Sequence, residues 1–92
     1  MKNSIIEKSV VWLKALGNKK RLRILTALKD KEQKVGELEQ IVDLSQSALS
    51  QHLAILRRAG IVSSRREAQS IYYSVKNADA LKLLKIFREI FK

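Results

Sequence analysis

The spacing of apolar residues in this chain changes at Gly60 from the period of a helix to the period of a strand. Before the glycine, the leucines of residues 49–56 recur every three or four positions, which places them on one face of a helix. After it, residues 62–66 and 71–75 alternate between two faces, as in a pair of strands. The intervening residues 67–69 lack the Asn-Gly signal of a tight turn, so we expect a longer loop built on a type I turn. The chain is therefore predicted to be mainly α-helical with one small β-hairpin, an α+β class.

Five helices are expected, over residues 4–16, 19–29, 35–42, 46–59 and 78–91. Gly17 follows the first apolar run and indicates a helix end. Asn18, Ser45 and Asn77 each precede a run, where their side chains can accept hydrogen bonds from the first backbone N–H groups. The short third helix lacks such a cap, because Lys34 holds the position.

The segment from Ile41 to Tyr73 has the order of parts of a winged helix-turn-helix. A short apolar helix ends near Asp43, Ser45 begins the fourth helix, and an arginine-bearing hairpin follows. Folds with this order insert a helix into a DNA groove and lay the hairpin along the DNA backbone. We therefore predict a winged helix-turn-helix with four helices, two strands and a final helix, in a single domain over residues 1–92.

The composition of the chain points to a polyanionic partner. Its 92 residues carry a formal charge of +10, with an isoelectric point near 10.2. Cationic side chains favour binding to phosphates because they release the condensed counterions. The alternative is a basic surface that serves only solubility. Arginines cluster in the second half of residues 41–73, which favours double-stranded DNA, and the basic residues 19–23 are either a second phosphate contact or a solvated helix start.

The fourth helix carries small polar residues on the face opposite its leucines. We predict that Ser47, Ser50 and Gln51 contact base edges in the major groove, because short hydrogen-bonding side chains suit that role. Gln46, at the helix start, is predicted to lie near a phosphate or a base. The alternative is a merely solvated face, although such faces more often carry Glu and Lys.

Further contacts are expected from the residues that follow. Arg65, Arg66 and Gln69 on the hairpin are predicted to meet the DNA backbone or the minor groove. Arg57 and Arg58, at the end of the fourth helix, are predicted to divide between phosphate contact and support of the hairpin. Solvated side chains remain the alternative for the hairpin residues.

The first and last helices carry more apolar surface than one core can cover. In the last helix, residues 81, 84, 87 and 91 form one apolar arc, and residues 83, 86 and 90 form a second. We predict a homodimer joined through these two helices; the alternative is an exposed apolar arc, which is unfavourable for a small protein. The predicted interface residues are Ile6, Val10, Trp12, Leu13, Leu83, Ile86, Phe87 and Ile90.

Several classes of protein are excluded or disfavoured. The chain contains no cysteine, which rules out disulfides, zinc fingers and thiol catalysis. No apolar run reaches the roughly 18 residues of a membrane span. Glu7, Lys8 and Lys14 interrupt the apolar stretch near the N-terminus, which does not fit a signal peptide. We expect a cytoplasmic protein associated with the nucleoid.

His52 is the only histidine, and it lies at the edge of the leucine stripe of the fourth helix. We expect a packed, hydrogen-bonded structural role for it rather than metal binding or catalysis. Ser47 and Ser50 lie on a plain helix, without the glycine-rich turn that presents a nucleophilic serine. The chain is therefore not expected to be an enzyme.

Three stretches of the sequence are similar to a known family: KRLRIL at 20–25, VGELEQIVDLSQSALSQHLAILRRAGIV at 35–62 and RREAQSIYYSV at 65–75. They resemble the ArsR family of bacterial winged-helix regulators over nearly the whole chain. The hairpin is similar to that of the HlyU-like and BigR-like branch. The resemblance implies a symmetric dimer that binds an operator through the fourth helix and the hairpin.

Members of this family usually sense a metal ion or an oxidant. The resemblance places metal-binding cysteines at residues 37–40, which here are Glu-Leu-Glu-Gln, and other metal ligands in the last helix, which here has Asp79 and Glu89 but no histidine. It places a pair of switching thiols at Thr26 and close to Lys92. We therefore expect no metal, no cofactor and no thiol sensor, and the effector is unknown.

These observations lead to one functional hypothesis and one alternative. The hypothesis is a sequence-specific transcriptional regulator, a repressor or an anti-silencing activator, that binds an imperfect palindrome as a homodimer. The alternative is a non-specific architectural protein of nucleoid DNA, which the charge fits equally well. Competition with random DNA separates the two, because specific complexes are about 10³-fold tighter or more.

Overall fold

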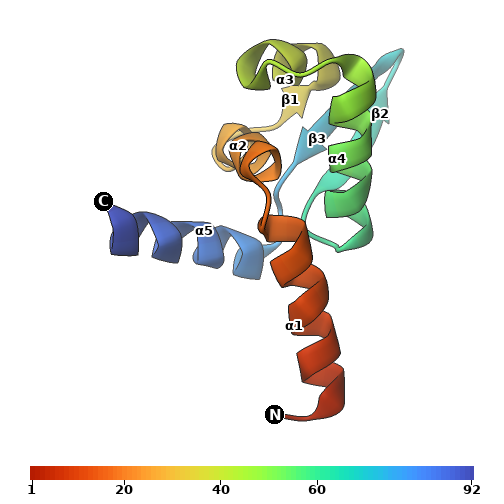
Figure 1. Ribbon diagram of the computed structural model, residues 1–92. Coiled ribbons are helices and arrows are strands. Elements are labelled where there is room, and N and C mark those ends of the chain that lie inside the picture. Colours follow the sequence, from red (N-terminus) through yellow and green to blue (C-terminus); the bar gives the residue numbers. More distant parts are fainter.

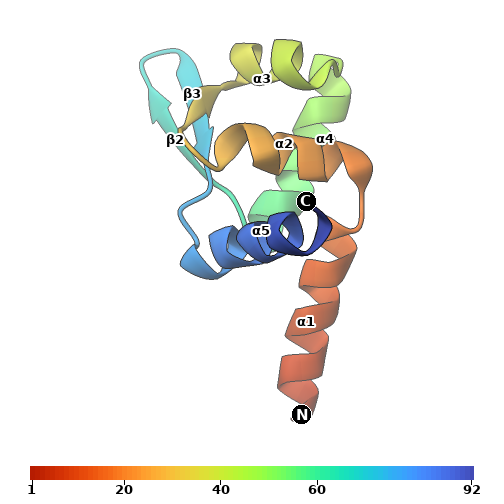
Figure 2. The same cartoon turned by 90° about the vertical axis from the view of Figure 1, so that its left-hand side faces the viewer.

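The computed structural model describes residues 1–92 and consists of five helices and a small sheet. The elements are α1 (Asn3–Leu16), α2 (Lys19–Leu28), β1 (Gln33–Lys34), α3 (Val35–Val42), α4 (Gln46–Arg58), β2 (Ser63–Glu67), β3 (Ser70–Ser74) and α5 (Ala78–Phe91). The predicted winged helix-turn-helix is confirmed, and each predicted helix is present to within one residue at either end. Helices α2, α3 and α4 gather beside the sheet, whereas α1 and α5 extend away from this group (Figures 1 and 2).

The caps predicted from the sequence are confirmed. Asn18 Oδ1 accepts a hydrogen bond from the backbone N–H of Arg21 at 3.1 Å, and Ser45 Oγ accepts one from Ala48 at 3.2 Å. Asn77 Oδ1 accepts hydrogen bonds from the backbone N–H groups of Asp79 and Ala80 in α5, at 2.9 and 3.1 Å. These side chains satisfy backbone donors that have no partner within the helix, and so they fix where α2, α4 and α5 begin.

Helix α3 is held at both ends without a conventional cap. At its start, the side chain of Glu37 accepts a hydrogen bond from the backbone N–H of Lys34 at 2.9 Å. At its end, Asp43 adopts a left-handed backbone with a φ of 53°, a conformation that Asp tolerates better than most residues. The resulting reversal of the chain leads directly to the cap of α4.

The sheet contains a third strand that the sequence pattern does not reveal. Strand β1 pairs with β3, with Gln33 opposite Tyr73 and Lys34 opposite Tyr72, so the strand order is β1-β3-β2. A strand of two residues has no measurable alternation, which is why it escapes prediction. Gln33 is buried at 5% exposure, and its side-chain amide donates to the carbonyl of Ala27 at 3.4 Å. The polar side chain is therefore satisfied inside the fold.

The predicted long loop at the tip of the hairpin is wrong. Glu67 pairs with Ser70, which leaves only Ala68 and Gln69 in the turn. Ala68 supplies the left-handed backbone that a two-residue hairpin needs, with a φ of 57°. A Cβ in this region costs about 1–2 kcal/mol, and glycine or asparagine normally avoids that cost. The turn thus forms without the residues by which such turns are usually recognised.

The core lies between α2, α3, α4 and the base of the hairpin. The predicted leucine stripe of α4 is confirmed, because Leu49, Leu53 and Leu56 are at most 2% exposed. Helix α1 contributes only its last residues to the fully buried set, and α5 contributes only Ala80 near its start. Each of these two helices is therefore anchored at one end. None of the helices combines the length and the apolar character that crossing a bilayer requires.

Candidate nucleic-acid interface

The first half of α4 presents the four polar side chains predicted from the sequence to contact DNA. Gln46, Ser47, Ser50 and Gln51 are all exposed. None of their side chains forms a hydrogen bond within the chain, although their neighbour Ser45 does. Because the leucines on the opposite face are locked in the core, α4 cannot rotate, and its polar face is fixed outward.

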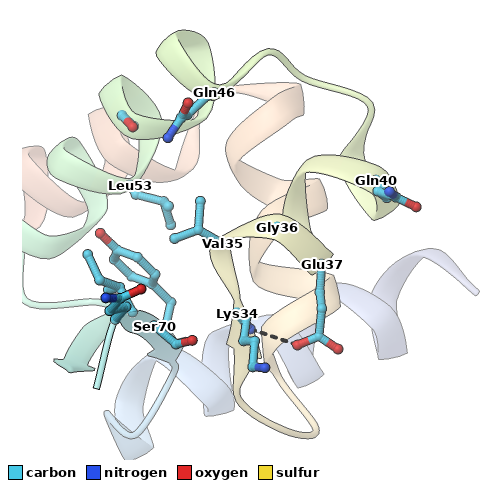
Figure 3. A pocket seen from close by; sticks show the side chains of 12 residues that line it. Lys34, Val35, Gly36, Glu37, Gln40, Gln46, Leu53 and Ser70 are labelled. Atoms are coloured by element: carbon cyan, nitrogen blue, oxygen red, sulfur yellow. Dashed lines mark hydrogen bonds between the residues drawn. The ribbon is translucent and has the colours of Figure 1, made fainter. Parts of the chain in front are cut away.

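An open groove of about 750 Å³ separates the start of α4 from α3 and from the tip of the hairpin. Gln46 lines it from α4 (Figure 3). Ser50 also lines it from α4, and Gln69 lines it from the hairpin. The structure thus brings together three of the predicted residues from two separate elements. Lys34 and Gln40 line the same groove from the α3 side, and no periodic pattern in the sequence pointed to them.

The two arginines at the end of α4 have different surroundings. Arg57 donates a hydrogen bond from Nη1 to the hydroxyl of Ser64 on β2 at 3.3 Å, which links α4 to the hairpin. Arg58 is exposed and donates from Nε to the carbonyl of Ala54 on its own helix at 3.3 Å. The predicted support of the hairpin is therefore the role of Arg57, while Arg58 keeps its two terminal nitrogens free.

The hairpin separates the two arginines that were expected to act together. Arg66 is opposite Ile71 and Arg65 is opposite Tyr72 in the β2–β3 register. Side chains opposite one another in an antiparallel pair lie on the same face of the sheet. Ile71 lines the groove beside α4, so Arg66 lies on the groove face and Arg65 on the outer face.

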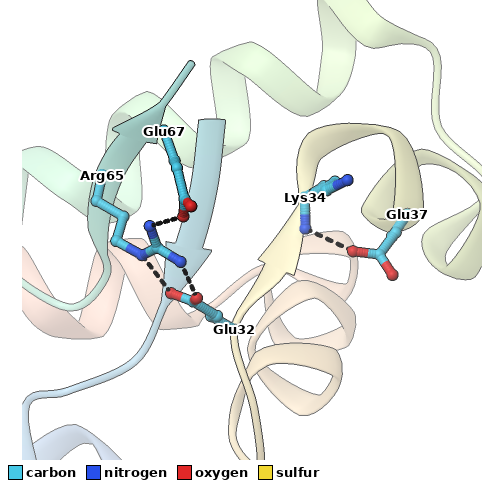
Figure 4. A network of polar contacts seen from close by, with 5 residues as sticks. All are labelled: Glu32, Lys34, Glu37, Arg65 and Glu67. Carbon is cyan, nitrogen blue, oxygen red and sulfur yellow. Dashed lines mark hydrogen bonds and ion pairs between the residues drawn. The ribbon is translucent and has the colours of Figure 1, made fainter. Parts of the chain in front are cut away.

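Arg65 is enclosed in a network on the outer face of the sheet (Figure 4). Its Nε donates to Glu32 at 3.0 Å and Nη2 donates to the other oxygen of the same carboxylate, while Nη1 donates to Glu67 at 2.6 Å. Its guanidinium also stacks on the ring of Tyr72, 4.4 Å from the centroid. The hydrogen bond from Arg65 and its positive charge lower the pKa of Glu32, and the two carboxylates raise the pKa of Arg65. Arg65 and Glu32 therefore form an ionised pair at neutral pH.

His52 has the structural role predicted for it. Its Nδ1 lies 3.2 Å from Nη1 of Arg21, whose other nitrogens donate to the carbonyls of Ala15 at 2.6 Å and Lys14 at 3.0 Å. Because the guanidinium can only donate, Nδ1 accepts and the ring is neutral. Partial burial and the charges of Arg21 and Lys20 lower the pKa of His52. Arg21 is thus bound within the chain, which removes it from the basic cluster at residues 19–23.

The comparison with known sequences decides the family. The family described as bacterial regulatory protein, arsR family, matches residues 18–64, from the cap of α2 to the first strand of the hairpin. The chain belongs to the ArsR family. Its exposed polar helix, its basic hairpin and its fold are those of a sequence-specific DNA-binding transcriptional regulator.

Two ArsR-family relatives have opposite regulatory descriptions. The transcriptional activator HlyU of Vibrio cholerae is 47% identical over 84 residues, which cover 91% of this chain and 78% of HlyU. The biofilm growth-associated repressor of Agrobacterium fabrum is 42% identical over 81 residues, which cover 88% of this chain and 69% of the repressor. The solved structure of HlyU from V. cholerae matches with a TM-score of 0.90 at 44% identity, over 99% of this chain and 98% of that one.

The positions where the family resemblance places metal-binding or thiol sensing residues hold neither kind of site in this structure. No group of three or more His, Cys, Asp or Glu side chains is placed to hold a metal ion. Thr26 donates its hydroxyl to the carbonyl of Leu22 on the same helix at 2.8 Å. Both residues line a cavity of about 490 Å³ between α2 and α5, together with Leu81 and Leu84.

Helices α1 and α5 leave large apolar side chains in solvent. Most of the residues predicted for a dimer interface are exposed, with the following fractions: Ile6 43%, Val10 40%, Leu13 66%, Ile86 37%, Phe87 36% and Ile90 63%. Ile5, Val11 and Phe91 of the same two helices are also exposed, and the prediction omitted them.

Trp12 and Leu83 differ from the other predicted interface residues. The indole N–H of Trp12 donates to the carbonyl of Ala59 at the end of α4, at 2.9 Å, and both Trp12 and Leu83 pack against the core. They form the floor of a crevice of about 530 Å³ between α1 and α5, which Leu13 and Phe87 also line. Trp12 and Leu83 therefore pack within the chain, whether or not a second protomer covers them.

Proposed function

We propose that this ArsR-family regulator binds an imperfect palindrome in double-stranded DNA as a homodimer, with one α4 helix from each protomer in the major groove. The observation that carries the proposal is the face of α4 at residues 46–51, where four hydrogen-bonding side chains are exposed and have no partner within the chain. Side chains of this size and chemistry can reach the edges of bases when a helix enters the groove.

The residues of α4 have distinct proposed roles. Gln51 is the candidate for bidentate pairing with adenine, and Ser47 and Ser50 are permissive contacts that allow close approach of the helix. Gln46 lies at the capped start of α4, where backbone N–H groups and the helix dipole favour a phosphate. Fixed rotation of α4 by its buried leucines supports this assignment, since base contacts require a defined register.

The remaining proposed contacts are to the DNA backbone. Arg66 has no ion pair and lies on the groove face of the hairpin, and Gln69 lies at the tip beside the same groove. Arg58 offers its terminal nitrogens at the other end of α4. Such contacts position the protein on the duplex and make its affinity depend on salt.

A second copy of the chain is proposed to cover the apolar surfaces of α1 and α5. Exposed apolar patches of this kind are uncommon on monomers and typical of interfaces, and a two-fold dimer matches a palindrome. In such dimers, the two reading helices enter grooves about 34–36 Å apart. The pairing would also stabilise two helices that are each anchored to the core at one end.

Regulation by this dimer is proposed to be either repression or activation by displacement of a silencing protein, at chromosomal DNA in the cytoplasm. We propose no catalytic role, because His52 is held by Arg21 and the serines of α4 lie on a regular helix. We also propose no metal or thiol sensor, so binding is expected to ignore chelators and thiol oxidants.

The test is a selection of bound fragments from genomic DNA with purified protein at physiological salt. The proposal predicts recovery of a small set of fragments that share two half-sites in inverted orientation, with centres separated by about one helical turn or a multiple of it. Recovery of random fragments in proportion to their length would instead favour a non-specific architectural protein, the alternative that the charge of +10 allows.

A further inference from the structure

Arg65 crosses the outer face of the whole sheet. It begins on the edge strand β2, its guanidinium stacks on Tyr72 of the central strand β3, and it binds both oxygens of Glu32, which immediately precedes β1 (Figure 4). One side chain therefore joins an edge strand to the chain segment on the opposite side of the sheet. Glu67, two residues along β2, binds the remaining terminal nitrogen.

We infer that Arg65 is a positioning residue that fixes the wing, the β2–β3 hairpin at residues 63–74, relative to the DNA-reading helix α4. It acts as a clamp with Glu32 and does not bind a phosphate. The inference rests on the proposed function for its effect on DNA binding, but the clamp itself is a property of the free protein.

The first argument is that the guanidinium is already occupied. Nε, Nη1 and Nη2 each donate to a carboxylate oxygen, and the face of the guanidinium lies on an aromatic ring. Arg65, Glu32 and Glu67 together carry a net charge of −1, from one positive and two negative groups. A phosphate would have to displace two carboxylates from the guanidinium, including the bidentate pairing with Glu32.

The second argument is that the wing has few other contacts to hold it against the rest of the fold. All five residues of β2 are exposed, and β2 pairs only with β3. A two-stranded hairpin is marginally stable by itself in water. On the groove face, the hydrogen bond between Arg57 and Ser64 holds the wing to α4; on the outer face, the Arg65–Glu32 pair holds it to the start of β1. The two ties act on opposite faces of the same strand.

The third argument is that removal of Glu32 should change the affinity for DNA in opposite directions for the two possible roles of Arg65. If Arg65 bound phosphate, removal of Glu32 would release it and reduce repulsion of DNA, and the affinity would rise. If Arg65 is a clamp, removal of Glu32 loosens the wing, and the affinity falls despite the loss of a negative charge. The pKa of Glu32 is lowered by Arg65, so the clamp is intact throughout the neutral range in which these assays are done.

The first part of the test measures amide hydrogen exchange in the free protein. Glu32→Ala and Arg65→Ala should each speed exchange in residues 63–67 and 70–74 by about two- to fivefold, the range that exposed ion pairs give in coupling measurements. The double variant should be no faster than either single one. Arg65→Lys should not restore protection, because lysine cannot pair in a bidentate manner. Unchanged exchange in Arg65→Ala would overturn the inference.

Two controls accompany this measurement. Asp30→Asn removes a negative charge from the same loop as Glu32, but the ion pair of Asp30 is with Lys29, so this change should leave the wing unchanged. Exchange of the core amides of α4 should be the same in all variants, which shows that any change is confined to the wing. If Asp30→Asn loosens the wing as much as Glu32→Ala does, charge and not the clamp is responsible, and the inference fails.

The second part uses a DNA duplex recovered by the fragment selection. Across a salt series, Arg66→Ala should reduce the slope of log K against log salt by about one unit, whereas Arg65→Ala should weaken binding and leave the slope unchanged. A loss of about one unit in Arg65→Ala would make it a phosphate ligand and overturn the inference. If no duplex binds, the proposed function fails, and the exchange measurement still decides whether the clamp exists.

Discussion

The indole N–H of Trp12 donates a hydrogen bond to the carbonyl of Ala59, 2.9 Å away, and so joins α1 to the end of α4. At the C-terminal end of α1, Arg21 binds the carbonyls of Lys14 and Ala15 and contacts His52 in the middle of α4. The helix proposed to meet the second protomer is therefore bonded at two points to the helix proposed to read DNA. The separation of the two reading helices should follow directly from how the two α1 helices pack.

Trp12→Phe should lower the free energy of unfolding by about 1 kcal/mol, the usual contribution of one hydrogen bond, because the ring remains and the donor is lost. Chemical denaturation monitored by circular dichroism measures the change. Oligomeric state should be unaffected, because an apolar ring still lines the crevice between α1 and α5. An unchanged stability would mean that water replaces the indole at Ala59 without penalty.

Leu13→Glu and Ile90→Glu should each convert the protein from dimer to monomer at micromolar concentration, because both place a charge on a surface that the proposed interface would bury. Sedimentation equilibrium measures the effect. Lys82→Glu serves as the control, since Lys82 is exposed on the polar side of α5 and should leave the dimer intact. A wild-type protein that sediments as a monomer would refute the proposed assembly.

Gln51→Ala should reduce discrimination between the selected site and a site with a changed half-site base pair, by about 1–3 kcal/mol for a bidentate contact. Its affinity for random duplexes should stay the same, because no phosphate contact is lost. Fluorescence anisotropy with matched duplexes gives both quantities. If discrimination is as strong as in the wild type, Gln51 does not take part in base readout.

Acidification should destabilise the fold through His52. Its pKa is lowered in the folded state, so the folded protein binds fewer protons than the unfolded chain, and stability is full above the unfolded pKa of 6.5 and falls as the pH drops through the lower folded value. His52→Gln should keep a hydrogen-bond acceptor for Arg21 and remove this dependence. Thermal melts between pH 7.5 and about 5.5, around the unperturbed histidine pKa, give the comparison. Equal slopes in the two proteins would show that another group titrates.

The parts of the fold that the sequence predicts are those with a long repeating pattern or a local cap. The leucine stripe of α4 spans several turns and therefore shows a clear period. Asn18 and Ser45 each cap a backbone N–H only three residues further on, so these caps can be predicted from the local sequence. The exposed polar face of α4 follows from the same wheel that places its leucines in the core. This is why the candidate base-reading residues could be named before the structure.

The missed features depend on partners that are distant in the sequence. Strand β1 exists because β3 pairs with it, and its two residues have no period of their own. Arg65 meets Glu32 across 33 positions, and Trp12 meets Ala59 across 47, so neither contact has a local signal. A basic residue on a wing suggests a phosphate contact, and only the register of the hairpin shows which face it occupies.

The central claim is that the polar face of α4 reads a sequence, and one affinity ratio tests it most directly. The dissociation constants of the selected site and of a random duplex of equal length should be measured for the purified protein at physiological salt. The account predicts a ratio of about 10³ or more, reduced in Gln51→Ala and retained in Arg66→Ala. A wild-type ratio near one would contradict it.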